Sequence, residues 1–168
     1  MPEITVQSPI GPLTLAEADG CITRLDWRAA RRNTETPLLR EARRQLLAYF
    51  AGSLREFDLP LSLGGSPFQL RVWQAMQRIP YGSTRSYGEL AHDTDSAPRA
   101  VGYACGSNPL AIIVPCHRVL AAGRRIGGYS GGEGIATKRR LLEIESAPAA
   151  ARRELPLFES SALAAARS

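Results

Sequence analysis

The residues best suited to chemistry are Cys116 and His117, which are adjacent in the sequence IVPCHRV at positions 113–119. Only the thiolate form of cysteine is a good nucleophile, and a free thiol with a pKa of about 8.5 is roughly 3% ionised at pH 7. A neighbouring histidine and arginine raise that fraction, because one can accept the proton and the other supplies positive charge. The heptad therefore predicts a chemical step at Cys116.

His117 is the candidate base for this step. Adjacent side chains in extended backbone point to opposite faces, so we expect a bridging water rather than a direct bond between the Cys116 sulfur and the His117 ring. A buried carboxylate behind the ring would set its tautomer and stabilise the imidazolium. We expect Glu145 in that place. Glu143 and Glu133 are the alternatives, because the pairing is spatial and cannot be read from sequence distance.

The composition is that of an ordinary soluble protein of 168 residues, 44% of them hydrophobic. Such a chain can form one compact body or two small lobes. Its apolar runs, among them residues 110–114, are far shorter than the ~20 residues of a membrane span. The start, MPEITVQ, lacks the pattern of an export signal. We therefore expect no membrane association and a cytoplasmic location.

The cysteine and histidine content argues against a bound metal. Cys21, Cys105 and Cys116 cannot all pair, so free thiols in a reducing compartment are expected. The chain has two histidines and no C-x-x-C spacing, so we expect no metal and no cofactor. Cys105 is expected to pack as a small hydrophobic residue, with a second thiol near the pocket as the alternative.

The net charge of +5 is unevenly distributed. Residues 1–65 hold 8 basic and 8 acidic side chains, whereas residues 66–145 hold 10 and 6. The basic excess in the second segment indicates a polyanionic partner, and a mildly basic solvated surface is the alternative. All of the 21 basic residues are arginine except Lys138. Arginine suits phosphate recognition, although codon bias explains the same pattern.

The first part of the chain predicts a small antiparallel sheet and a helix. Three short strands are expected at 4–7, 13–17 and 21–27, separated by turn residues. A helical pattern then runs from Pro37 to Gly52. Residues 59–65 are expected to form a short edge strand and a linker.

The second part predicts a series of short helices. Ser66 is expected to cap a helix reaching about Arg78, and Ser86 with Glu89 forms a second capping box. Ser96 is expected to cap a further helix that ends near Gly106. The last two helices flank a turn of about four residues, the layout of a helix-turn-helix, which by itself is a weakly specific motif.

A glycine-rich loop at 127–134 precedes the final helix, which we expect Thr137 to cap. The loop lacks the Gly-Lys-Ser/Thr ending of a phosphate-binding P-loop, so nucleotide hydrolysis is not expected. We divide the chain into an N-terminal α/β domain at 1–65, a catalytic and DNA-binding domain at 66–150 and a tail at 151–168.

Together these segments resemble the O6-alkylguanine-DNA alkyltransferases, and SPIGPL at 8–13 is similar to the bacterial members. The likeness is carried by FQLRVWQAM at 68–76, IPYGSTRSYGELA at 79–91, PRAVGYACGSNPLAIIVPCHRV at 98–119, GGYSGG at 127–132 and LLEIE at 141–145. It covers about the first 150 residues and excludes the tail. The implied fold class is α/β (α+β): a ribonuclease-H-like N-terminal domain, then a mostly helical, winged-helix-like DNA-binding domain with a helix-turn-helix.

The resemblance implies direct and irreversible DNA repair. Cys116 would attack the alkyl carbon on O6 of guanine and keep it as a thioether, so that each molecule acts once. O4-alkylthymine is a further candidate substrate. The partner would be double-stranded DNA, entered from the minor groove with the damaged base flipped out, and the protein would act as a nucleoid-associated monomer without a cofactor.

The resemblance also implies roles for individual residues. In the catalytic group, His117 is the water-linked base, Glu145 its orienting partner, and Asn108 braces the active-site turn. In the DNA-binding group, Arg99 fills the gap left by the everted guanine, and Ala100 and Gly102 lie against the DNA. The residues expected to contact the flipped nucleotide are Tyr87, Tyr129, Ser130 and the backbone carbonyls of Cys116 and Val119.

Two readings of other classes compete with repair. Cys116, His117 and Glu145 could form a cysteine hydrolase or acyltransferase, with the glycine-rich loop as its oxyanion hole. Alternatively, the helix-turn-helix alone could serve a non-catalytic lesion-binding regulator. Relatives of that kind lack the cysteine, so Cys116 argues against the regulator.

Overall fold

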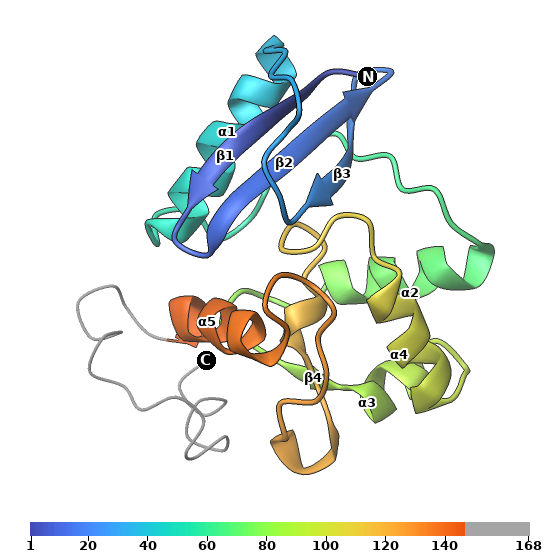
Figure 1. Cartoon of the computed structure of the whole chain (residues 1–168). Coiled ribbons are helices and arrows are strands. Elements are labelled where there is room, and N and C mark those ends of the chain that lie inside the picture. The colour runs from blue at the N-terminus through green and yellow to red at the C-terminus, as the bar shows by residue number, and fades with distance from the viewer. Residues whose placement is uncertain (147–168) are drawn as a thin grey trace. The chain divides into compact units, whose positions relative to one another are not determined.

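The computed structural model describes residues 1–146, and the chain divides into two compact units, Met1–Gly64 and a second beginning at Gly65. The tail predicted at 151–168 lies outside the described residues. The first unit combines a sheet with one helix, and the second is mostly helical (Figure 1). The mixed α/β fold class predicted from the sequence is thereby confirmed.

The first unit is a three-stranded antiparallel sheet in the order β1-β2-β3. Its strands are β1 (Glu3–Ser8), β2 (Gly11–Ala18) and β3 (Cys21–Asp26). The β2–β3 hairpin turns at Asp19 and Gly20, which have φ values of 50° and 75°. Two consecutive positive φ values favour an Asp-Gly pair, because glycine carries no steric penalty there and aspartate a small one.

One helix, α1 (Pro37–Phe50), contacts all three strands of this sheet (Figure 1). Thr36 caps it by accepting a hydrogen bond from the Leu39 backbone N–H at 3.0 Å. The core between helix and sheet is formed by apolar side chains at helical spacing and alternating strand positions: Ile4, Val6, Leu13, Leu15, Leu39, Ala42, Leu46 and Tyr49. The edge strand predicted at 59–65 is reduced to a single bridge between Leu61 and Ile22.

The second unit holds four α-helices and a two-stranded parallel sheet among its described residues. The elements are α2 (Pro67–Gln77), β4 (Arg85–Ser86), α3 (Tyr87–Asp93), α4 (Pro98–Gly106), β5 (Val119–Leu120) and α5 (Ile135–Ser146). The buried Trp73 indole N–H donates to the Ala104 carbonyl at 2.8 Å and so joins α2 to α4. The helix-turn-helix, formed by α3 and α4, therefore packs against α2.

Helix capping follows the sequence at two of four predicted positions. Complete capping boxes form at Ser66 with Gln69 and at Ser86 with Glu89. The predicted cap at Ser96 is wrong: Ala97 precedes α4 without a side-chain cap, and the Ser96 hydroxyl pairs with Thr94 at 2.9 Å. Pro98 in the first turn, which needs no N–H there, fixes the start of α4 instead.

The predicted cap at Thr137 is also wrong, because α5 begins two residues earlier at Ile135. The Thr137 hydroxyl accepts from the Glu133 backbone N–H at 2.9 Å and so ties the glycine-rich loop to the first turn of α5. None of the described helices is long and apolar enough to cross a membrane.

Candidate active site

Cys116 opens a short 3-10 turn, Cys116–Arg118, within a fully buried run at 110–120. The extended backbone expected here is therefore wrong. No hydrogen bond joins the Cys116 sulfur directly to the His117 ring among the described contacts, as predicted, although the reason is a helical turn rather than a strand. Cys116 itself is 6% exposed.

Asn108 braces the turn that leads to the cysteine. Its side-chain amide donates to the Val114 carbonyl at 2.8 Å, and its side-chain oxygen accepts from the Leu110 N–H at 2.9 Å. Between them Ile112 has a φ of 76°, a strained conformation for a β-branched residue. Asn108 thus hydrogen-bonds to both ends of a strained turn.

Glu145, and neither Glu143 nor Glu133, lies at the imidazole. The Nε2 atom of His117 is 2.6 Å from Oε2 of Glu145, and both side chains are almost completely buried. The other ring nitrogen, Nδ1, is buried and has no hydrogen-bond partner among the described residues. The nitrogen left to accept a proton is therefore Nδ1.

Arg118 was expected to supply positive charge beside Cys116, and its pairing with Glu145 was not predicted. Its guanidinium donates to both oxygens of Glu145, at 2.8 and 3.1 Å, and to the Ile79 carbonyl at 2.7 Å. The signal was available in the sequence, because a charged residue inside a buried apolar run must find a partner of opposite charge. Arg118 fixes the carboxylate that in turn orients His117.

Burial and charge set the ionisation of this relay. Burial lowers the pKa of His117, so the ring is a neutral base at pH 7. Burial alone would raise the pKa of Glu145, but His117 and Arg118 outweigh it and lower that pKa, which keeps the carboxylate ionised. A neutral imidazole held by a carboxylate through Nε2 is poised to take a proton at Nδ1.

The Cys116 thiol is under opposing influences. Burial raises its pKa, whereas hydrogen bonds with the Asn108 and Tyr129 side chains and the charge of Lys138 lower it. The thiol therefore stays protonated in the resting protein and needs a base to become a nucleophile.

A cavity of about 490 Å³ opens at the sulfur. Its lining comes from α3, α4, the 3-10 turn and the glycine-rich loop: Tyr87, Gly102, Cys105, Gly106, Cys116, Gly128, Tyr129 and Ser130. Five of the predicted site residues thus line one cavity, although they lie far apart in the sequence. Arg99 and Ala100 do not line it, and Arg99 lies on the exposed surface of α4.

Lys138, the only lysine of the chain, is a second residue that was not predicted at the site. Its completely buried Nζ donates to the carbonyls of Val119 at 2.6 Å and Gly128 at 3.2 Å. Burial lowers its pKa to about 8. Lys138 joins β5, which follows the Cys116 turn, to the glycine-rich loop, and it occupies one lone pair of the Val119 carbonyl that was expected to bind guanine.

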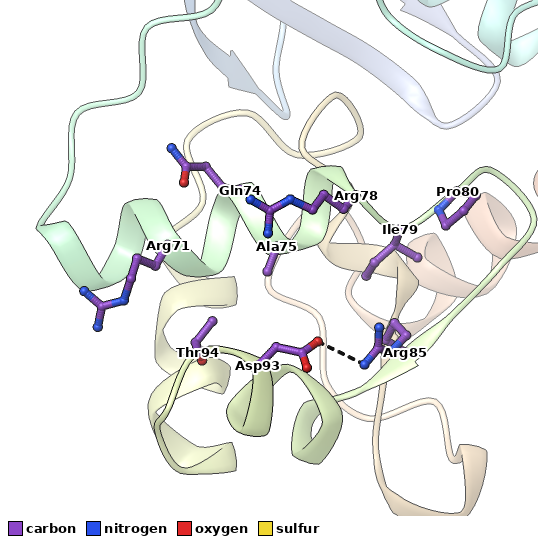
Figure 2. Close-up of a pocket in the computed structure, with 9 residues that line it drawn as sticks. All are labelled: Arg71, Gln74, Ala75, Arg78, Ile79, Pro80, Arg85, Asp93 and Thr94. Carbon is purple, nitrogen blue, oxygen red and sulfur yellow. Dashed lines mark hydrogen bonds and ion pairs between the residues drawn. The ribbon is translucent and has the colours of Figure 1, made fainter.

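A second cavity of about 330 Å³ lies between α2, β4 and the end of α3. Figure 2 shows Arg71, Gln74 and Arg78 projecting from α2, and a dashed line joins Asp93 to Arg85 at 3.0 Å. Its lining includes no cysteine and no histidine. This second cavity therefore offers no thiol for chemistry.

A buried histidine and carboxylate behind a cysteine, in a cavity lined in part by the second helix of a helix-turn-helix, are typical of a thiol-dependent enzyme that binds nucleic acid. The family model "6-O-methylguanine DNA methyltransferase, DNA binding domain" matches residues 67–147, and the ribonuclease-like domain of the same family matches residues 1–63. The chain belongs to the 6-O-methylguanine DNA methyltransferase family.

Individual relatives agree with this assignment. A methylated-DNA--protein-cysteine methyltransferase of Mycobacterium tuberculosis strain H37Rv is 50% identical over 92% of this chain and 97% of its own length. The constitutive enzyme of that name from Bacillus subtilis strain 168 is 47% identical over 84% of this chain and 93% of its own. A crystal structure of Mycobacterium tuberculosis OGT in complex with DNA superposes with a TM-score of 0.78 at 49% identity, over 90% of this chain and 98% of that one.

Proposed function

We propose that the protein repairs DNA by moving an alkyl group from O6 of guanine to the sulfur of Cys116, once per molecule. The function is that of a methylated-DNA--protein-cysteine methyltransferase, the activity for which its relatives are named. The observation that carries it here is a thiol at the floor of a 490 Å³ cavity with the His117–Glu145–Arg118 group behind it.

The proposed step is a direct displacement. The thiol proton leaves through a bridging water to Nδ1 of His117, and the resulting thiolate attacks the alkyl carbon. The S–C bond forms as the C–O6 bond breaks, the electron pair stays on guanine, and guanine takes up one proton. Glu145 stabilises the imidazolium formed at His117, and Asn108 holds the turn that carries the sulfur.

The cavity walls would stabilise the departing guanine. Burial raises the pKa of Tyr87 to about 12, so its hydroxyl remains a proton donor to the base. Ser130 and the Tyr129 segment line the cavity and would donate to O6, where negative charge gathers. The carbonyls of Cys116 and Val119 would accept from the exocyclic amine.

The substrate would be duplex DNA with the damaged base flipped out, because the thiolate cannot reach O6 inside the base stack. α4 would enter the minor groove, with Ala100 and Gly102 against the DNA and Arg99 in the gap left by the base. O4-alkylthymine has the same kind of alkyl ether and is a further candidate substrate. We place the protein at the nucleoid, acting as a monomer without a cofactor.

Each domain predicted from the sequence is assigned its own function. We assign catalysis and DNA binding to residues 66–150 and a scaffolding role to residues 1–65. The charge supports this, since the first 65 residues carry equal numbers of acidic and basic side chains. Residues 147–150 lie outside the described part of the chain.

The test is the intact mass of the protein before and after incubation with a duplex containing O6-methylguanine. We expect a gain of one methyl group on the tryptic peptide that contains Cys116, in an amount equal to the protein, and no further product. Continued turnover on esters or amides would indicate the hydrolase instead. Binding of the lesion without any gain in mass would indicate a non-catalytic regulator.

A further inference from the structure

The surface of α4 carries one large residue that the proposed reaction does not use, Tyr103. Gly102, beside it in the chain, lines the cavity at Cys116, and a Cβ added there would meet nothing within 4 Å. Arg99 lies four residues before Tyr103, which places the two side chains on the same face, one helical turn apart. Arg99 and Tyr103 are therefore the large side chains on a helix whose other residues are small, and whose Gly102 lines the cavity.

Tyr103 is 72% exposed, whereas Tyr49 is 0% and Trp73 is 1% exposed. Its side chain makes no hydrogen bond, ring contact or ion pair within the described part of the chain. An aromatic side chain buries about 150–250 Å² when it is packed, so this exposure leaves a large apolar contribution unused by the fold. The folded chain gives no structural reason for a tyrosine at this position.

We propose that Tyr103 is a DNA-contacting residue that packs its ring against sugar and base edges in the minor groove, one helical turn from Arg99. The inference rests on the proposed function, because it takes α4 as the helix that meets DNA. Large apolar side chains on minor-groove proteins commonly press on or between base steps. Tyr103 would hold the duplex next to the flipped nucleotide, while Arg99 fills the gap.

A ring contact and a phosphate contact differ in their response to salt. Loss of a phosphate contact reduces the slope of log Kd against log salt concentration by about one, because one counterion fewer is released. Loss of a ring contact weakens binding without changing that slope. The salt dependence thus separates the proposed role of Tyr103 from a general effect on the charge of α4.

The experiment compares Tyr103→Ala and Tyr103→Phe with the unmodified protein, and Leu47→Ala serves as a control because Leu47 is another exposed large apolar residue, on α1. We expect Tyr103→Ala to raise the Kd for undamaged duplex about tenfold, the effect typical of one lost aromatic contact, with an unchanged salt slope. Tyr103→Phe keeps the ring and should bind within about twofold of the unmodified protein. Leu47→Ala should change neither binding nor rate.

A second measurement is the rate of Cys116 methylation by O6-methylguanine in a duplex and as the free base. Tyr103→Ala should slow the duplex reaction more than the free-base reaction. An unchanged Kd, or an equal loss on both substrates, would overturn the proposal. Duplex affinity does not depend on alkyl transfer, so a protein that binds through Tyr103 but gains no methyl group would contradict the proposed function alone.

Discussion

The carboxylate of Glu145 is shared by two neighbours in the chain, His117 at 2.6 Å and Arg118 at 2.8 Å. Because consecutive residues of one 3-10 turn bond to the same carboxylate, the turn that carries Cys116 is fixed to α5. The pair with Arg118 keeps Glu145 ionised, and the ionised Glu145 keeps the proton of His117 on Nε2. The stability of this site and the orientation of His117 therefore depend on one side chain.

Replacing Glu145 by Gln should destabilise the protein by about 3–5 kcal/mol, the usual cost of leaving a buried charge without its partner, here Arg118. Urea denaturation at pH 7 measures this loss. Glu143→Gln on the same helix is the matched control, since Glu143 is only partly buried and makes no ion pair among the described residues. Equal stability of the two variants would contradict the shared-carboxylate account.

The same carboxylate predicts an acid limit to stability. The pKa of Glu145 is lowered in the folded protein by His117 and Arg118, so the unfolded chain binds its proton more readily. The stabilisation is therefore complete above the unfolded pKa of about 4.3 and is lost as the pH falls through the lower folded value. The free energy of unfolding should drop less steeply between pH 5 and pH 3 in Glu145→Gln than in the unmodified protein.

Replacing His117 by Gln should slow methylation of Cys116 at pH 7 by about 100-fold or more, because a positioned base contributes at least that much. In the unmodified protein, burial lowers the pKa of His117, so the rate should hold below pH 6.5 and fall only in more acidic solution. The rate–pH profile measures both effects. In His117→Gln the rate should rise with pH as solvent hydroxide ionises the thiol, and a flat profile would argue against a base role.

Lys138 should titrate near pH 8 rather than near its usual value, because burial lowers its pKa to about 8. It is the only lysine, so labelling lysine with ¹³C at Cε gives a single signal whose shift against pH reports this group. A midpoint above 10 would show that the side chain is solvated.

Lys138→Met removes a charge that favours the Cys116 thiolate and should move iodoacetamide labelling of Cys116 to higher pH, whereas Lys138→Arg should not.

Replacing Arg99 by Ala should slow repair of duplex DNA more than reaction with free O6-methylguanine, because the proposed work of Arg99 is to hold the duplex open after flipping, which costs a few kcal/mol. Rates on the two substrates test this directly. Arg71→Ala is a suitable control, since Arg71 is an exposed arginine on α2. An equal loss on both substrates would contradict the assignment of Arg99.

The helices and strands were largely predictable, because their signals are local. Alternating apolar residues marked β1 to β3, and the Ser66 and Ser86 capping boxes placed the starts of α2 and α3 correctly. The errors at Ser96 and Thr137 share one cause. A hydroxyl near a helix start can bond to several groups. The Ser96 hydroxyl pairs with the hydroxyl of Thr94, and the Thr137 hydroxyl accepts from the Glu133 N–H, so neither caps a helix.

The sequence by itself determined the family and singled out Cys116 and His117 as the candidate nucleophile and base, since these lie in the contiguous run 98–119 and in motifs at fixed separations. Only the tertiary structure decided which carboxylate meets His117, that Arg118 shares it, and that Lys138 joins two walls of the cavity. These pairings connect residues up to 28 positions apart, and His117 with Glu145 is the farthest. Packing of α5 against the 3-10 turn brings them together, and no local pattern records which side chains that packing will bury.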